Sequence, residues 1–261
     1  MKTIKEETLT AIGDAIREAE GTTELVPVVD MADRIKGVYD LGKKAQYDEY
    51  WDSVRYKMSD SSPYLFTGRF WSTTTFKPKY DILPKGNSSY YFYNNGFNGD
   101  VVQLCSELGI RFDTSQVTLA SLMFCWAQFT RLGVIDSTNM TDIANLFNNC
   151  TNLVTIDKWI ITERISFRNA FNNDTKLENL TIEGTIGQNG FDVQWSTKLS
   201  KASITSIINA LSTTTSGLII TLSKTAVNKA FATNAEATNG SSSNEWISLI
   251  ASRNNWTISL V

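Results

Sequence analysis

The sequence predicts an α/β protein in which N-terminal helices and a β- and turn-rich connector precede a short solenoid of repeated units. Three observations lead to this prediction. Charged residues are concentrated in the first fifth of the chain, aromatic residues among Pro and Gly fill the next stretch, and an aromatic-and-leucine pattern recurs in the second half. These changes in composition divide the chain into 1–57, 58–100 and 101–261.

The composition limits the chemistry that this chain can perform. It has 261 residues, with 24 Lys and Arg, 27 Asp and Glu, and no His, which excludes Ser-His-Asp and Cys-His catalysis and His-ligated zinc or haem. The net charge of −3 offers no bulk attraction to nucleic acid. No apolar run approaches the roughly 20 residues that cross a bilayer, and the chain opens without the apolar stretch of a signal peptide. We therefore expect synthesis in the cytoplasm, no nucleic-acid partner and no membrane insertion.

No sequence motif indicates a catalytic or metal site. The three cysteines, Cys105, Cys125 and Cys150, are odd in number and form no CxxC pair, which favours small buried side chains over disulfides or zinc ligands. Phosphate-binding, dinucleotide-binding and hydrolase motifs are absent. We expect no catalytic residue, no metal and no cofactor. A carboxylate pair such as Asp157 with Glu183 stays open as a glycosidase alternative.

Residues 1–57 have the pattern of two short amphipathic helices. Apolar residues recur at helical spacing up to Gly21, and again after Asp30, whose type favours the N-cap position. Two such helices have little apolar surface to bury by themselves. We expect them to form a homo-oligomer, with a trimer favoured; the alternative is that they fold back onto the rest of the chain. The side chains expected at the oligomer interface are Leu9, Ile12, Ile16, Met31, Ile35 and Val38.

Residues 58–100 combine aromatic side chains with turn-forming residues. The run from Tyr90 to Phe97 has high β-propensity, and Asn95-Gly96 is a hairpin-turn signal. Aromatic rings beside amides suit saccharide recognition, since a ring covers the apolar face of a sugar and amides bind its hydroxyl groups. Packing of these residues in a core is the alternative. The candidate ligand-binding residues are Tyr90, Tyr91, Tyr93, Asn95, Phe97 and, in the repeat region, Trp159.

Three segments in the second half align without gaps, beginning at Trp126, Phe147 and Phe171. In each, Thr follows after four residues, Leu after six and an apolar residue after nine. The leucines are 21 and 24 residues apart, within the range of leucine-rich repeats. Each unit is predicted to form a short helical turn and a strand, with the aromatic residues stacked as an internal ladder. The expected strands are 132–135, 153–156 and 177–182.

Other elements are expected to complete this domain. The Asn pairs at 148–149 and 172–173 suit tight turns. The last part of the chain is expected to close the end of the solenoid, as a stacked array requires. The expected helices there are 203–211, 227–231 and 245–252, and the expected strands are 217–222 and 256–261.

Two parts of the chain resemble known families. The pattern (W/F)xx(C/F/D)TxL before an apolar strand, with the closing segments 191–211 and 255–258, resembles BspA-like leucine-rich-repeat proteins of gut Firmicutes and their prophages. The segments 9–17, 21–23 and 31–35 are similar to the start of tail-associated phage proteins, in which a helical head precedes a variable distal domain.

These resemblances imply a non-enzymatic phage tail-tip protein located in the virion. Its distal domain would recognise a host-surface glycan or protein by several weak contacts at once. Its other partners would be tail or baseplate proteins. The alternative is a bacterial BspA-type adhesin or protein-interaction scaffold.

Overall fold

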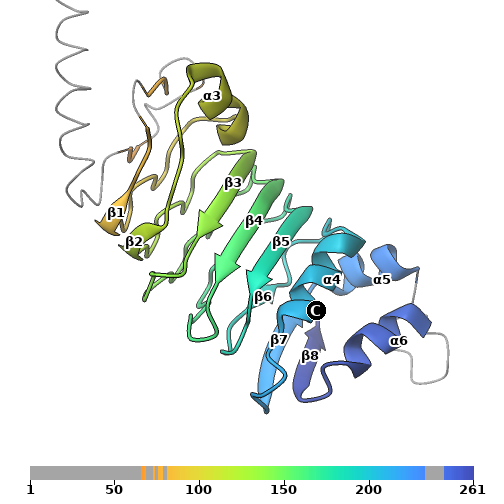
Figure 1. Cartoon of the computed structure of the whole chain (residues 1–261). Coiled ribbons are helices and arrows are strands. Elements are labelled where there is room, and N and C mark those ends of the chain that lie inside the picture. The colour runs from red at the N-terminus through yellow and green to blue at the C-terminus, as the bar shows by residue number, and fades with distance from the viewer. Residues whose placement is uncertain (1–65, 69–72, 74–75, 79–80, 233–243) are drawn as a thin grey trace, which may run out of the picture. The chain divides into compact units, whose positions relative to one another are not determined.

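The computed structural model describes residues 66–68, 73, 76–78, 81–232 and 244–261. The chain divides into two units, Met1–Val54 and Arg55–Val261. All the described residues belong to the second unit, which is mixed α/β with small parallel sheets (Figure 1). The predicted helices of residues 1–57 lie outside the described residues. The same holds for the predicted interface residues Leu9, Ile12, Ile16, Met31, Ile35 and Val38.

The described residues form short strands and helices, with five strands in succession between the first two of these helices. In order they are β1 (Lys85–Asn87), α3 (Val101–Leu108), β2 (Gln116–Leu119), β3 (Arg131–Asp136), β4 (Thr155–Ile161), β5 (Asn179–Gly184), β6 (Asp192–Val193), α4 (Lys201–Ala210), β7 (Leu218–Leu222), α5 (Lys224–Phe231), α6 (Asn244–Ala251) and β8 (Trp256–Leu260). The strands pair in parallel as β1-β2, β3-β4-β5 and β6-β7-β8.

The central sheet, β3-β4-β5, advances by 23 or 24 residues at each step. Arg131 lies beside Thr155, and Thr155 beside Asn179, which are steps of 24 residues. Between Ile156 and Trp159 the pairing of β4 with β5 shifts by one residue, so that Trp159 lies beside Ile182. The predicted strand 153–156 is corrected, because β4 begins at Thr155 and continues to Ile161. Leu153 precedes this strand, and the buried partner of Leu132 is instead Ile156.

Four segments of eight residues repeat the same backbone conformation, and we call them turn units: 88–95, 120–127, 143–150 and 167–174. In each, the carbonyls of the first and fifth residues accept bonds from the N–H groups of the fourth and eighth. The third and seventh residues have positive φ, as the third residue of a type II turn requires. The predicted β-run 90–97 is therefore corrected: residues 90–95 belong to the first turn unit, and residues 96–97 follow it without regular secondary structure.

Successive turn units are joined by a ladder of backbone hydrogen bonds. The N–H groups at the third, fifth and seventh positions donate to the carbonyls at the second, fourth and sixth positions of the next unit, at 2.8–3.1 Å. Phe147, for example, donates to Ala170. This ladder satisfies the backbone on this side of each repeat without a regular strand.

A stack of phenylalanine rings fills the core beside this ladder. The fifth positions hold Phe92, Phe124, Phe147 and Phe171, and Phe66 extends the stack by one ring. Adjacent ring centroids are 5.3–5.5 Å apart and the planes differ by 22° at most. The prediction of an internal ladder is confirmed for Phe147 and Phe171.

The prediction that Trp126 is the third member of this ladder is wrong. Phe124, two residues earlier, stacks on Phe147, while 42% of Trp126 is exposed. Trp126 occupies the seventh position of its turn unit, where the side chain leaves the core.

Helix α4 covers the free edge of β5 (Figure 1). The Ser203 hydroxyl accepts from the N–H of Leu180 at 2.9 Å and donates to the carbonyl of Glu178 at 2.9 Å. One turn later, the Ser206 hydroxyl accepts from the N–H of Ile182 at 2.8 Å. Two serines on one helix face thus replace the strand that would otherwise pair with this edge.

The elements after residue 200 follow the prediction closely. Helices α4, α5 and α6 and strands β7 and β8 fall at the expected positions. Ser200 and Ser223 cap the N-termini of α4 and α5 through their side chains. The sequence therefore predicted these elements correctly but not their caps, whereas α3, β1, β2 and β6 had no counterpart among the predicted elements.

The positive φ at the third position of each turn unit predicts the effect of one substitution. Leu122 holds this position with φ 59°, whereas the next two units have Asn there. Because Asn tolerates this conformation better than a branched apolar residue, Leu122→Asn should raise the free energy of unfolding by about 1 kcal/mol. Urea denaturation of the full chain measures the change. The reverse substitution, Asn145→Leu, is the matched control and should lower stability; equal effects of the two would contradict the backbone argument.

Candidate functional site

The outward positions of the turn units form one surface, which we call the turn face. Since the fifth residue of each unit points into the core, the third, sixth and seventh side chains lie at the surface, apart from buried Cys125. The turn face consists of Tyr90, Tyr93, Asn94, Leu122, Trp126, Asn145, Asn148, Asn149, Asn169, Asn172 and Asn173. All of these are half-buried or exposed.

The asparagine side chains of this face hold one another in place. The amide of Asn148 donates to the side-chain oxygen of Asn145 at 2.9 Å, and Asn149 donates to Asn148. Asn173 donates across to Asn149 at 2.8 Å, which links two successive turn units. The amides are therefore fixed before any ligand arrives.

Trp126 is the most exposed aromatic side chain of the turn face. Its φ is +63°, an unusual backbone conformation for a bulky residue. The backbone is held on both sides: its N–H donates to Asn148 O at 2.9 Å, and its carbonyl accepts from Gln128 Nε2 at 3.0 Å. The Gln128 side chain in turn accepts from Asn152 Nδ2 at 2.9 Å. An exposed ring on a fixed, strained backbone is a feature that occurs at functional sites.

Two tyrosines continue the aromatic character of the turn face. Tyr90 and Tyr93 are half-buried, and their rings meet edge to face with centroids 5.5 Å apart. They occupy the same third and sixth positions as Asn145 and Asn148. The face therefore changes from aromatic to amide as it passes from the first turn unit to the third.

The turn face carries almost no charge. Residues 86–99, 114–130 and 143–156, which contain the first three turn units, include no Asp, Glu, Lys or Arg. In the fourth unit, Arg168 is exposed and Asp174 is buried. A ligand on this face would therefore be recognised by hydrogen bonds and ring contacts rather than by ion pairs.

The structure keeps two of the six predicted ligand-binding residues at the surface. Tyr90 and Tyr93 belong to the turn face. The other four, Tyr91, Asn95, Phe97 and Trp159, are at most 6% exposed, and this burial corrects their assignment to a recognition patch.

Each of these four residues has an identifiable place in the interior. The Trp159 indole N–H donates to the Ser137 hydroxyl at 2.8 Å, and its ring packs edge-on against Phe147 and Phe171. The Asn95 amide donates to Phe66 O at 2.9 Å and accepts from the N–H of Phe97 at 2.9 Å.

Tyr91 is buried against Phe66 and Phe92, and burial raises the pKa of its hydroxyl well above the ordinary value.

Sequence reasoning missed Trp126 as a surface residue. It placed the Asn pairs 148–149 and 172–173 correctly in turns but gave the asparagines no part in a binding surface. Trp126 was placed in the core because the alignment matched it with Phe147, although Phe124 gives the same spacing to within two residues. Asn145, Asn149, Asn169 and Asn173 carry a signal that could have found them, since Asn recurs at intervals of four within a unit and of 24 between units.

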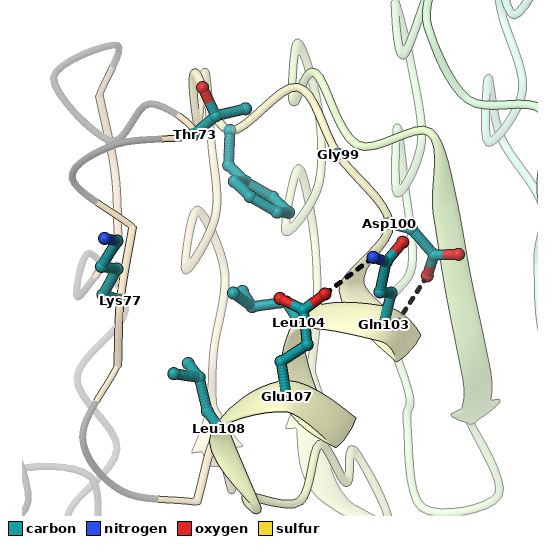
Figure 2. Close-up of a pocket in the computed structure, with 9 residues that line it drawn as sticks. Thr73, Lys77, Gly99, Asp100, Gln103, Leu104, Glu107 and Leu108 are labelled. Carbon is teal, nitrogen blue, oxygen red and sulfur yellow. Dashed lines mark hydrogen bonds between the residues drawn. The ribbon is translucent and has the colours of Figure 1, made fainter.

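A groove beside α3 is a second candidate site. It has a volume of about 400 Å³, and Figure 2 shows Leu104 and Leu108 on one wall with Thr73 and Lys77 across from them. Three of its polar side chains have partners: Asp100 caps α3 through the N–H of Gln103, and Gln103 Nε2 donates to Glu107 at 2.7 Å (Figure 2). The groove combines apolar walls with the carboxylates of Asp100 and Glu107, so it lacks the repeated uncharged amides of the turn face.

The carboxylates left open as a glycosidase pair are both in ion pairs. Asp157 receives two bonds of 2.8 Å from the Arg131 guanidinium. Glu183 lies 2.6 Å from the Lys158 ammonium. Within the described residues, no group of three or more Cys, Asp and Glu side chains is placed to hold a metal ion. In the same part of the chain, no helix is both long and apolar enough for a bilayer crossing.

The cysteines are buried and free, as the sequence predicted. Burial raises the pKa of Cys105 to about 11 and that of Cys125 to about 12, helped by nearby carboxylates. The pKa of Cys150 is also raised, mainly by burial. Thiols with such raised pKa values are almost entirely protonated at neutral pH and are poor nucleophiles.

Asp174 is a buried carboxyl at the eighth position of its turn unit. Its Oδ1 accepts from the N–H of Cys150 at 2.8 Å, and its Oδ2 has no hydrogen-bond partner. Burial raises the pKa of Asp174 well above the usual range, although the bond from Cys150 acts in the opposite direction. At the same position of earlier units, Asn95 and Cys150 donate to the carbonyls of Phe66 and Phe124, both at 2.9 Å. Protonation of Asp174 would give its carboxyl group a hydrogen to donate, as the side chains of Asn95 and Cys150 do at this position.

This burial predicts that Asp174 makes stability depend on pH. Since the folded-state pKa is the higher one, the contribution of Asp174 is fully present below the unfolded pKa of about 4 and is lost as pH rises towards the folded pKa. Asp174→Asn should therefore stabilise the protein at pH 7.5 by roughly 1–3 kcal/mol and much less at pH 4.5. Urea denaturation at both pH values measures this difference.

The control for this prediction is Glu178→Gln, at an exposed carboxylate in the same repeat. It should leave the stability difference between the two pH values close to that of the parent protein. If Asp174→Asn changed stability equally at both pH values, ionisation of Asp174 would not destabilise the folded protein, and the prediction would be wrong.

No family model, curated protein or solved structure matches this chain. What supports a function is therefore the geometry and chemistry of the turn face.

Proposed function

We propose that this chain is a non-enzymatic phage tail-tip protein whose second unit binds a ligand on the host surface. In this proposal the described residues are a short leucine-rich-repeat solenoid of the BspA-like type. The parallel pairing of β3-β4-β5 at steps of 23 or 24 residues, the four turn units and the stacked phenylalanines support the solenoid. Helix α4, which covers the edge of β5, would be part of its terminal cap.

The turn face is the observation that carries the binding role. Repetition brings equivalent side chains into one row, so an extended ligand can make the same contact at several units. The fixed amides and the exposed ring of Trp126 offer such contacts, and Tyr90 and Tyr93 add a second aromatic group. The buried thiols and ion-paired carboxylates fit a binding role better than a catalytic one.

Multivalency would convert weak contacts into firm attachment. Residues 1–57 would assemble the chain as a homo-oligomer, with a trimer favoured, and join it to other tail or baseplate proteins. Several turn faces on one virion would then act together, because a second contact within the same assembly occurs at a high effective concentration.

Oligomeric state tests this proposal. Light scattering on the full chain should give an oligomer, with three copies as the expected number. Replacement of Ile12 and Ile35 by Asp should convert it to a monomer, since charges would be placed in the expected apolar interface. Denaturation of the second unit should be unaffected, and Lys36→Glu, which leaves the apolar positions unchanged, is the matched control.

A monomeric full chain would remove the argument for a tail protein. The second candidate, a bacterial BspA-type adhesin or interaction scaffold, would then be favoured, because the turn face of a single copy suffices for it.

A further inference from the structure

We propose that the ligand of the turn face is a neutral saccharide and that Trp126 is the platform on which a sugar ring stacks. The inference rests on the proposed binding function and specifies its ligand class. Three features of the turn face support it: the exposed indole, the fixed amides around it and the absence of charge.

The indole of Trp126 is presented in the way that stacking requires. Its side chain is 42% exposed, while its backbone is fixed by bonds to Asn148 and Gln128. In the adjacent units the same seventh position holds Asn94 on one side and Asn149 on the other. Hydrogen-bonded neighbours in parallel arrays lie roughly 4.8 Å apart. A ring that covers the indole would therefore bring its edge groups within reach of amides from neighbouring units.

The amides retain hydrogen-bonding capacity for such a ligand. An Asn side chain has two N–H donors and two acceptor lone pairs. Asn149 uses one donor towards Asn148 and one lone pair for Asn173. One donor and one lone pair remain, which is the pair of groups that a sugar hydroxyl or acetamido group can bind.

The lack of charge selects among saccharides. The three segments that carry the first three turn units contain no ionisable Asp, Glu, Lys or Arg. An anionic ligand, such as a uronate, sulfate or phosphate ester, would find no cationic side chain within these three segments to pair with its charge. Arg168 and Lys176 in the next repeat are exposed cations, and the Lys176 ammonium already donates to Asn152 at 2.7 Å. A hexose or N-acetylhexosamine polymer brings no such charge and can continue from one turn unit to the next.

The positive φ at Trp126 allows the ring to be removed without loss of stability. Asn occupies the seventh position in the other described turn units, so Trp126→Asn introduces the residue that the backbone prefers. The variant should fold at least as well as the parent and lose only the ring. Trp126→Phe keeps a smaller ring, and Trp195→Ala removes an exposed tryptophan (46%) outside the turn face.

The experiment measures binding of the full chain to immobilised maltohexaose, laminarihexaose, chitohexaose and a galactose hexamer, with hyaluronan and polygalacturonate fragments as anionic probes. We expect at least one neutral oligosaccharide to bind more tightly than either anionic probe. Calorimetry on the best probe should show about a tenfold loss of affinity for Trp126→Asn, a smaller loss for Trp126→Phe and no change for Trp195→Ala. Urea denaturation checks that Trp126→Asn is folded.

Two results would overturn the saccharide inference: no binding to any neutral probe, or unchanged affinity in folded Trp126→Asn. A second measurement separates this failure from failure of the proposed function. Labelled full chain is applied to a panel of Firmicutes cells treated with periodate, which cleaves vicinal diols, or with protease. Binding lost after protease but retained after periodate would indicate a protein receptor, so that receptor binding stands and the saccharide does not. Binding to no cell and no probe would reject both.

Discussion

The rest of the structure depends on a match between two distances. One is the distance between hydrogen-bonded backbone neighbours, and the other is the distance between stacked aromatic rings. The turn ladder requires adjacent units to lie about 4.8 Å apart, and the phenylalanine centroids are 5.3–5.5 Å apart with nearly parallel planes. Offset stacking of rings is favourable in this range. One phenylalanine per repeat satisfies both spacings. Each turn unit is therefore aligned with the next one position for position, as the hydrogen bonds between the units show.

The same constraint explains the chemistry of the turn face. Two positions in every turn unit need positive φ, and Asn is the non-glycine residue that tolerates it best. The fold therefore places rows of amides on the surface for backbone reasons alone. A residue other than Asn at such a position points to a role outside the backbone. Trp126 is such a residue, since nothing in the backbone conformation favours tryptophan there.

Sequence patterns could predict the elements whose signals are local. Helices α4 to α6 and strands β7 and β8 have clear apolar patterns, α4 and α5 begin at serine caps, and Phe147 and Phe171 stand out as members of a repeat. The errors arose where long-range register decides between local options. Tyr90 to Phe97 has strand propensity and a hairpin signal, yet pairing with Ser121 and Met123 of the next unit makes it a turn.

Trp126 shows the same limit on a smaller scale. With Phe124 two residues away, both choices give a plausible repeat, and only the conformation of the whole unit separates them. Burial of the candidate ligand residues was unpredictable for a related reason. Tyr91, Asn95 and Trp159 contact residues 22–29 positions away, and alternation along one segment carries no information about those contacts.

The near-identity of the 23- and 24-residue steps between Phe124, Phe147 and Phe171 has an evolutionary consequence. A block of this length that begins and ends at the same position of the unit meets equivalent neighbours at both junctions, so recombination between repeats can add or delete one block without a new interface. The serine-lined cap on β5 would remain at the end of the array, whatever its length. Gain or loss of one block would therefore change how many surface positions this chain displays and leave the core contacts the same.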